Sequence, residues 1–289
     1  MWRWYKVLIV DLNQVMISNF MVQIGNHTNI KIEEDLLRHM VLNSLRGYNA
    51  KFRNAYGEMI IACDDRGSWR KAIYPYYKAN RKKDREKSEI DWHKVFEVLN
   101  KIREELKAYF PYRVIQIESA EADDVIGTLC QEFGNTSEKI MIISGDKDFR
   151  QLHSYMNVRQ YDPVKKKIIE ENSPDRYLKE HIMKGDRGDG VPNFLSRDDC
   201  FVLNSRQKPL SSKKLDLWVT LEPEAFCDDN MLRGWKRNQQ LVDLNFIPVD
   251  IKGKIIDSYN EQHGKPRDKL FSYFVENKLS NLLTDIDQF

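Results

Sequence analysis

Short acidic motifs that follow apolar runs are the sequence feature that most constrains the fold of this chain. Ten carboxylates fall into five motifs: Asp11 in VLIVDLN, Asp64 and Asp65 in MIIACDD, Glu121, Asp123 and Asp124 in AEADDVIG, Asp146 and Asp148 in IMIISGDKDF, and Asp186 and Asp189 in KGDRGDGVPN. Three of these motifs close runs of Val, Ile, Leu and Ala that are typical of buried strands. Because ligands bind at the carboxyl ends of parallel strands in open α/β sheets, we expect these acids to meet there.

Carboxylates that meet in one place need counter-charge. They repel one another, and are protonated or destabilise the fold, unless cations hold them. An all-oxygen site of this kind suits Mg²⁺, with Mn²⁺ as a substitute. Two such ions can activate water and stabilise the leaving oxygen of a phosphodiester, so the pattern predicts a two-metal phosphodiester enzyme.

Basic residues are concentrated in one Tyr-containing segment. Residues 66–87 include nine basic and two acidic side chains, a net charge of +7, whereas the whole chain has a net charge of only +2. An acidic metal pocket beside a basic strip suits a polyanionic substrate that metal bridges to the carboxylates.

The hydrophobic pattern predicts an α/β fold. Expected strands at 7–10, 59–63, 113–117 and 140–143 alternate with expected helices at 33–45, 91–109 and from an N-cap at Ser119 to about 133. A short helical segment is expected at 147–153. This alternation is typical of a mostly parallel sheet with helices on both faces.

The later part of the chain has a different character. We expect an α/β domain over 1–173, with a basic arch at about 66–94, and a helical DNA-binding region over 174–289. In that region, helices at 174–184 and about 198–203 flank the glycine-containing turn, a helix-turn-helix whose backbone N–H groups could hold DNA phosphates. Residues 248–289 are expected to be mainly helical, and 204–234 remain unassigned.

Cysteines and hydropathy bear on the compartment. Four cysteines are dispersed without a CxxC pair, which indicates a reducing cytosol rather than a disulfide scaffold. No stretch approaches the roughly 20 apolar residues that span a bilayer. We therefore expect a soluble, cytoplasmic monomer that does not bind membranes.

Each motif taken alone has other interpretations. The helix dipole stabilises acidic residues in a helix's first turn by about 0.3–1 kcal/mol. The acids of EADD could therefore have this structural role and no catalytic one. A haloacid-dehalogenase phosphatase would need a second Asp where Asn13 stands. A Toprim site would explain GDKDF but leaves Asp64, EADD and the GDRGD motif unexplained.

The motifs WRKAIYPYYKANR, EADD, SGDKDF and GDRGDGVP, in this order and spacing, resemble those of the 5′-nuclease family. This family comprises flap endonucleases, 5′→3′ exonucleases and the nuclease domains of bacterial DNA polymerases, and within it the chain is most similar to the T4-type bacteriophage ribonucleases H. The resemblance covers essentially the whole chain. It implies a PIN-like fold and a Mg²⁺-dependent enzyme that removes RNA primers and 5′ DNA ends or flaps during lagging-strand replication, in the host cytoplasm if phage-encoded.

The resemblance also implies roles for the acidic residues. Asp11, Asp64, Asp123 and Asp146 would surround the first metal, and Asp148, Asp186 and Asp189 would lie on the second-metal side. Glu121 would be an outer-shell acid that orients metal-bound water. Asp64 matches the family position better than Asp65, and Asp124 is expected to be a helix-cap or surface residue.

Basic and aromatic residues of the arch receive roles in the same way. Arg70 and Lys78 match the basic pair that reaches the scissile phosphate, and Tyr77 would stack on a terminal base. For Tyr74, packing under the arch helix is as good an interpretation as a role in substrate binding. The residues expected to contact nucleic acid are Tyr77, Arg81, Lys82, Lys83, Arg85, Gly188 and Gly190.

The implied partners are RNA–DNA hybrids and duplex DNA with free 5′ ends or flaps, and a single-strand-binding protein or sliding clamp. Many relatives have GDxxDNIPG, whereas this chain has Gly190 and Asn193 in GDRGDGVPN, which puts monovalent-cation binding at that turn in doubt. Two other functions stay open: a catalytically inactive branched-DNA-binding protein and a PIN-like single-strand ribonuclease. Acids at all eight matched positions argue against the first, and the basic strip with the GDxxD turn argues against the second.

Overall fold

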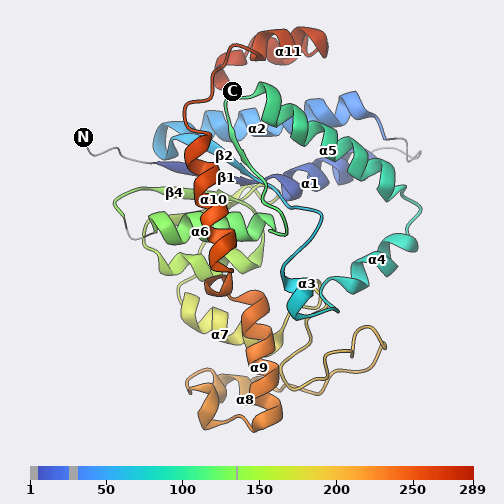
Figure 1. The fold of residues 1–289 in the computed structure, drawn as a ribbon, viewed down its shortest axis with the longest axis vertical. Helices are drawn as coiled ribbons and strands as arrows, with labels where there is room; N and C mark the ends of the chain where they lie inside the picture. The colour runs from blue at the N-terminus through green and yellow to red at the C-terminus, as the bar shows by residue number, and fades with distance from the viewer. Residues whose placement is uncertain (1–5, 26–31, 135) are drawn as a thin grey trace.

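A six-stranded sheet forms the centre of the molecule (Figure 1). The computed structural model describes residues 6–25, 32–134 and 136–289, apart from the side chains of 82–84. The strands are β1 (Val7–Asp11), β2 (Glu58–Ala62), β3 (Arg113–Ile115), β4 (Ile140–Ile143), β5 (Val158–Asp162) and β6 (Lys167–Ile169). Their order is β3-β2-β1-β4-β5-β6, and all neighbours are parallel except the β5–β6 pair. The predicted mostly parallel sheet is therefore confirmed.

The strand order creates a crevice at the carboxyl end of β1. From β1, the chain builds β2 and β3 to one side, then crosses over to place β4 and β5 on the other. Loops that leave neighbouring strands in opposite directions open a gap at such a switch point, where ligands bind in open α/β sheets. The acidic motif after β1 and the one after β4 flank this gap.

Helices make up most of the rest of the chain. They are α1 (Leu12–Gly25), α2 (Glu34–Tyr56), α3 (Arg70–Ile73), α4 (Ala79–Glu86), α5 (Trp92–Tyr109), α6 (Ala122–Phe133), α7 (Pro174–Lys184), α8 (Ser212–Trp218), α9 (Asp229–Val242), α10 (Val249–Glu261), α11 (Leu270–Glu276) and α12 (Ser280–Leu283). Short 3₁₀ helices are η1 (Lys147–Ser154), η2 (Pro223–Ala225), η3 (Leu244–Phe246) and η4 (Ile286–Gln288). None of the described helices is long and apolar enough to cross a membrane.

Two apolar layers cover the two faces of the sheet. Successive strand side chains point to opposite faces, so Leu8 and Val10 pack with α2, α5 and the C-terminal helices, while Val7 and Ile9 pack with α6 and α10. Figure 1 shows α2 and α5 on one side of the sheet and α6 and α10 on the other. The expected coverage of both faces is confirmed.

A third apolar cluster joins the basic arch to the C-terminal helices. Tyr74 and Tyr77, on either side of the turn between α3 and α4, pack with residues of α7, α8 and α9, including Met183 and Trp235. From there α4 leads back to α5 (Figure 1). The start of the arch is thus anchored in a core, and packing is the role that the structure gives Tyr74.

Two local predictions are wrong. Helix α6 begins at Ala122 rather than after Ser119, because Glu121 and Asp124 form a reciprocal capping box. The second helix expected at 198–203 is absent, since these residues form turns. The Asp198 carbonyl accepts a hydrogen bond from the Tyr74 hydroxyl, and Asn204 adopts a left-handed conformation, φ 51°, that a helix cannot continue through. A helix-turn-helix of the expected form is therefore not present.

Candidate active site

One cavity brings together all seven aspartates that the sequence assigned to metal binding. It has a volume of about 910 Å³. The lining aspartates are Asp11 at the end of β1, Asp64 after β2, Asp123 in the first turn of α6, Asp146 and Asp148 after β4, and Asp186 and Asp189 after α7. Four basic residues, Lys78, Arg81, Arg85 and Lys147, also line it. The cavity therefore lies at the crevice that the strand order defines, with an excess of acidic side chains.

Hydrogen bonds from neighbouring helices and from the loop after β4 hold Asp11 and Asp64 in place. The Asp11 carboxylate accepts hydrogen bonds from the Ser144 hydroxyl at 3.1 Å and from the Gln14 amide at 3.1 Å. The Asp64 carboxylate accepts from the Ala122 amide at 2.7 Å and from the Asn13 side chain. These contacts tie together the ends of β1, β2 and β4 and the start of α6.

The carboxylates of this group are difficult to ionise in the metal-free protein. Burial, reinforced by the charge of Asp64, raises the pKa of Asp11 to about 7. Burial raises the pKa of Asp146 to about 6, with Asp148 adding to the effect. The pKa values of Asp64 and Asp123 are raised as well, again mainly by burial. Buried carboxylates without enough counter-charge shift in this direction.

The second group of aspartates, Asp148, Asp186 and Asp189, includes two that lie beside a histidine, His181. The Asp148 amide donates to the Asp146 carboxylate at 2.9 Å, and Asp186 accepts from the amides of Gly188 and Asp189 and pairs with Lys147 Nζ at 2.7 Å. Although burial acts to raise it, the hydrogen bond and charge of Lys147 lower the pKa of Asp186. Ligand atoms of Asp148, His181 and Asp186 all lie within 4.8 Å of one another.

His181 was not predicted from the sequence. Its position five residues before Asp186, in the last turn of α7, is the only sequence signal that points to it. A single histidine in an otherwise acidic constellation gives no periodicity to recognise, and its proximity to Asp148 depends on how α7 packs on η1.

Lys78 and its neighbours hold the arch against the acidic site. Lys78 Nζ lies 2.5 Å from Glu121 Oε1 and 3.8 Å from Asp189 Oδ2, and Arg81 pairs with Asp189 at 2.6 Å. The Lys78 amide also donates to the Asp189 carbonyl at 2.7 Å. Although burial acts to lower it, the charges of Asp189 and Glu121 raise the pKa of Lys78 above its usual value. Lys78 therefore remains a cation at the edge of the cavity.

The structure corrects the expected position of Arg70. Its side chain is only 3 % exposed and lines none of the cavities around the aspartates. It pairs with Glu121 at 3.0 Å and with Asp124 at 2.8 Å, and donates to the Leu241 carbonyl. A guanidinium so enclosed positions Glu121 and the start of α6 and does not reach a phosphate. Asp124 is accordingly a helix cap, as expected, but a buried one.

Tyr77 is also buried, which corrects the expected stacking on a terminal base. The residue is 3 % exposed. Its hydroxyl contacts Glu121 Oε2 and Asp189 Oδ2, each at 2.9 Å. Burial, with the charges of Asp189 and Glu121, raises the pKa of the Tyr77 hydroxyl, which therefore stays protonated. Glu121 thus contacts Lys78, Arg70 and Tyr77. Although burial acts to raise it, the charges of Lys78 and Arg70 and the hydrogen bonds from Lys78 and Tyr77 lower the pKa of Glu121.

The predicted nucleic-acid contacts divide into accessible and enclosed positions. Arg81 and Arg85 are exposed and line the cavity, and Gly188 is exposed beside it. Gly190 is buried, and a Cβ there would lie 3.0 Å from the Tyr76 carbonyl, so it contacts the arch rather than offering its backbone to a phosphate. The side chains of Lys82 and Lys83 lie outside the described part of the structure.

Asp65 faces away from the acidic cavity. Its carboxylate accepts hydrogen bonds from the Ser119 amide at 2.9 Å and the Gln116 side chain at 3.3 Å. Asp64, in contrast, lines the cavity with the other aspartates. The choice of Asp64 over Asp65 therefore agrees with the geometry.

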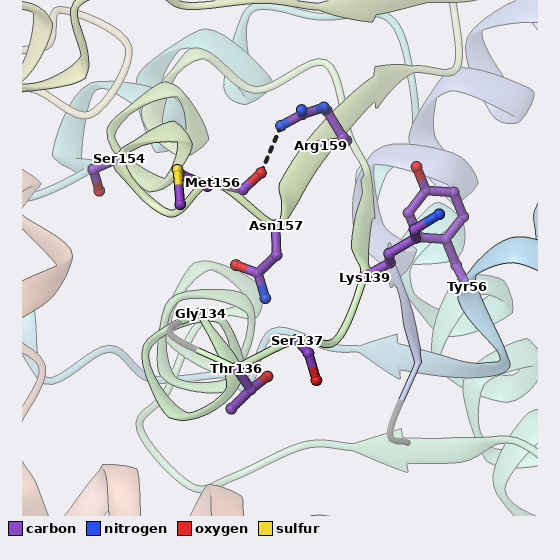
Figure 2. A pocket seen from close by; sticks show the side chains of 9 residues that line it. All are labelled: Tyr56, Gly134, Thr136, Ser137, Lys139, Ser154, Met156, Asn157 and Arg159. Atoms are coloured by element: carbon purple, nitrogen blue, oxygen red, sulfur yellow. Dashed lines mark hydrogen bonds between the residues drawn. The ribbon is translucent and has the colours of Figure 1, made fainter.

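A second cavity, at the opposite edge of the sheet from the aspartates, has no acidic lining. It has a volume of about 750 Å³ and lies at the amino ends of β2, β4 and β5, beside Tyr56, Lys139 and Asn157. Figure 2 shows these side chains with Arg159, which donates to the Met156 carbonyl at 3.1 Å. No carboxylate lines this cavity, so it has none of the ligands of the acidic site.

Comparison with known proteins identifies the class to which this fold and site belong. A family model described as 5′-3′ exonuclease, N-terminal resolvase-like domain matches residues 6–182, and a model described as T4 RNase H, C terminal matches residues 172–289. The chain belongs to the 5′-3′ exonuclease and flap endonuclease family, and is a nuclease, a hydrolase of phosphodiester bonds.

Individual relatives agree with this assignment. The chain is 34 % identical to the ribonuclease H of Enterobacteria phage T4 over 98 % of its own length and 95 % of the relative. It is 34 % identical to DNA polymerase I of Caldicellulosiruptor bescii over 51 % of its length and 16 % of that protein. A bacteriophage T5 flap endonuclease, solved in complex with DNA and metal ions, has the same fold, with a TM-score of 0.63 at 16 % identity over 89 % of this chain and 98 % of that one.

Proposed function

We propose that this chain is a divalent-metal-dependent 5′-nuclease that removes RNA primers and 5′ DNA ends or flaps from duplex substrates during lagging-strand replication. The observation that supports it most is the gathering of seven aspartates in one cavity, edged by the basic arch. The phage T5 relative in complex with DNA and metal ions supports the same substrate class.

The residues present fit divalent cations. Burial raises the pKa values of five of the seven aspartates, Asp11, Asp64, Asp123, Asp146 and Asp189, so the surrounding side chains alone do not balance their negative charge. Oxygen ligands in this number suit Mg²⁺, with Mn²⁺ as a substitute. We assign Asp11, Asp64, Asp123 and Asp146 to one metal and Asp148, Asp186 and Asp189 to the other. Two divalent ions bound there would supply Lewis acidity and water of lowered pKa.

The side chains around the metals bind and orient the substrate. Lys78, which reaches Glu121 and Asp189 from the arch, offsets the negative charge that grows on the phosphate as water adds to it. Arg81 and Arg85 at the cavity mouth hold flanking phosphates. Water oxygen adds to phosphorus, the P–O3′ bond breaks, and the products carry a 5′-phosphate and a 3′-hydroxyl.

Glu121 would act from outside the metal ligands. Both of its carboxylate oxygens are engaged, one with Lys78 and the other with Arg70 and Tyr77. It therefore holds Lys78 in the cavity and would orient water on the metals at a distance. The division into an α/β domain over 1–173 and a helical region over 174–289, a monomeric state, and a single-strand-binding or sliding-clamp partner belong to the same proposal.

A cleavage assay tests the proposal. A 5′-labelled primer–template with an RNA or DNA 5′ end, with and without a flap, is incubated with Mg²⁺ or with EDTA. We expect 5′-phosphorylated nucleotides or short oligonucleotides with Mg²⁺ and none with EDTA. Duplex binding without cleavage would favour a branched-DNA-binding protein, and cleavage of unpaired RNA alone would favour a PIN-like ribonuclease.

A further inference from the structure

The second-metal side of the cavity includes a nitrogen donor. His181 Nε2 and single carboxylate oxygens of Asp148 and Asp186 lie within 4.8 Å of one another, and among the described residues this is the only such group of metal-ligating side chains. Asp148 comes from η1, His181 from the last turn of α7, and Asp186 from the loop that follows α7. Three donors, from two helices and the loop that follows one of them, thus lie close together.

His181 Nε2 has no hydrogen-bond partner among the described residues. The residue is 6 % exposed, and Nε2 lies 3.1 Å from Asp148 Oδ1, yet neither atom is part of a hydrogen bond. A buried polar atom that makes no hydrogen bond destabilises the fold, because it has lost its contact with water. With a neutral imidazole whose Nε2 is unprotonated, His181 Nε2 and Asp148 Oδ1 each carry a lone pair, and one cation could accept both.

Neighbouring residues hold the imidazole in place. The His181 ring stacks on Tyr177 at 6.0 Å between centroids and 23° between planes, and the His181 carbonyl caps α7 by accepting from the Gly185 amide. Gly185 has φ 67°, and a Cβ there would meet the Val191 carbonyl at 2.4 Å, so the turn that delivers Asp186 needs glycine. Meanwhile Lys147 supplies the positive charge beside Asp186.

We propose that His181 is a nitrogen ligand of the second metal, so that this site has mixed nitrogen and oxygen donors rather than oxygen donors alone. The proposal rests on the proposed function for the metal roles of Asp148 and Asp186. Imidazole favours Co²⁺, Zn²⁺ and similar ions over Mg²⁺, whose preferred ligands are oxygens. The site is therefore selective for transition-metal ions relative to an all-aspartate site.

Spectroscopy of bound Mn²⁺ tests the bond directly. Pulsed electron paramagnetic resonance on the full chain should show a ¹⁴N nucleus coupled to Mn²⁺, replaced by a ¹⁵N coupling when the protein contains ¹⁵N-histidine. The coupling should be lost in His181→Gln and retained in His93→Gln, a matched control because His93 lines the neighbouring cavity but not the ligand group. Absence of nitrogen coupling in the wild-type protein with Mn²⁺ bound overturns the proposal, and so does coupling that survives in His181→Gln.

Calorimetry gives a second readout. His181→Gln should weaken Co²⁺ binding by roughly tenfold or more, the size of effect typical for loss of a group that supports a metal site, and should weaken Mg²⁺ binding much less. Equal losses for both ions would mean that His181 only positions Asp148. If His181→Gln does not fold, as judged by circular dichroism, the ¹⁵N-histidine experiment on the wild-type protein decides.

Cleavage assays on the same preparations separate the two proposals. Mg²⁺-dependent cleavage without nitrogen coupling would remove His181 as a ligand and leave the proposed function intact. Nitrogen coupling in a protein that binds DNA but never cleaves it would support His181 as a ligand and contradict the proposed function.

Discussion

Removal of the Arg70 side chain is the perturbation for which sequence and structure give opposite expectations. The sequence resemblance predicts a slower chemical step in a stable protein, whereas the structure places the guanidinium between Glu121 and Asp124 at 3 % exposure. Truncation to alanine leaves Asp124, which is fully buried, without its cationic partner. Breaking a buried ion pair from one side destabilises a protein by about 3–5 kcal/mol. At roughly 2 °C per kcal/mol for a large domain, Tm should fall by about 6–10 °C.

Thermal unfolding followed by circular dichroism in EDTA measures this effect without metal. Arg70→Lys keeps the charge but not the paired contacts, and should fall between Arg70→Ala and the wild-type protein. Lys78→Ala is the matched control, because Lys78 also pairs with Glu121 but lies at the cavity, where water can replace it. A Tm for Arg70→Ala within about 2 °C of wild type, together with lost cleavage, would refute the buried structural role and restore the phosphate contact.

Four further outcomes follow from the site. Lys78→Ala should lower the single-turnover cleavage rate about 10²–10³-fold, as for loss of one donor to a developing charge, with little change in DNA affinity; an unchanged rate would remove this role. Asp123→Asn should abolish cleavage while gel-shift affinity for DNA is kept or improved, whereas Asp65→Asn, which alters a carboxylate outside the cavity, should cleave normally; near-normal cleavage by Asp123→Asn at saturating Mg²⁺ would contradict the metal assignment. The folded protein keeps a proton on Asp11 up to about pH 7 while the unfolded chain loses it near 3.8, so Tm in EDTA should fall as pH rises between these values, and Mg²⁺ should raise Tm more at pH 8 than at pH 5; a Tm that rises over this range would mean that the aspartates are not buried as described. Gapped circular duplexes and flaps capped by a bulky protein should resist cleavage while open 5′ ends are cut, and equal rates on both would show that the arch does not sense free ends.

The central sheet and the acidic cavity were predictable because their signals are local. Four strands are each a short apolar run, and β4 has the predicted bounds, 140–143. An aspartate after such a run must lie at the carboxyl edge of a parallel sheet, whatever the rest of the chain does. Asp11, Asp64, Asp146 and Asp148 could be placed from the sequence for this reason. Asp123 in α6 and Asp186 and Asp189 after α7 do not follow strands, and only the family resemblance pointed to them.

Contacts between distant segments account for what the sequence did not predict. Arg70 and Tyr77 occur in a basic segment that the sequence pattern predicts to be exposed. Contacts with the start of α6 and with α7 and α9 bury them. His181 depends on the same kind of contact, between α7 and η1. Strands β5 and β6 were missed because VRQYD and KII are short and mixed in polarity, and their strand character comes from pairing with β4 and with each other.

The placement of β1 beside β4 has a consequence for how the enzyme is made. These two strands are neighbours in the sheet although more than a hundred residues separate them, and pairing of such distant segments is slow because a long loop must close first. Domains form progressively as the chain leaves the ribosome. A nascent chain that has emerged only through β4 carries Asp11, Asp64 and Asp123 but none of the aspartates that follow. If the aspartates bind metal as proposed, a nascent chain whose loop after α7 has not yet emerged lacks Asp186 and Asp189 and should not cleave nucleic acids near the ribosome.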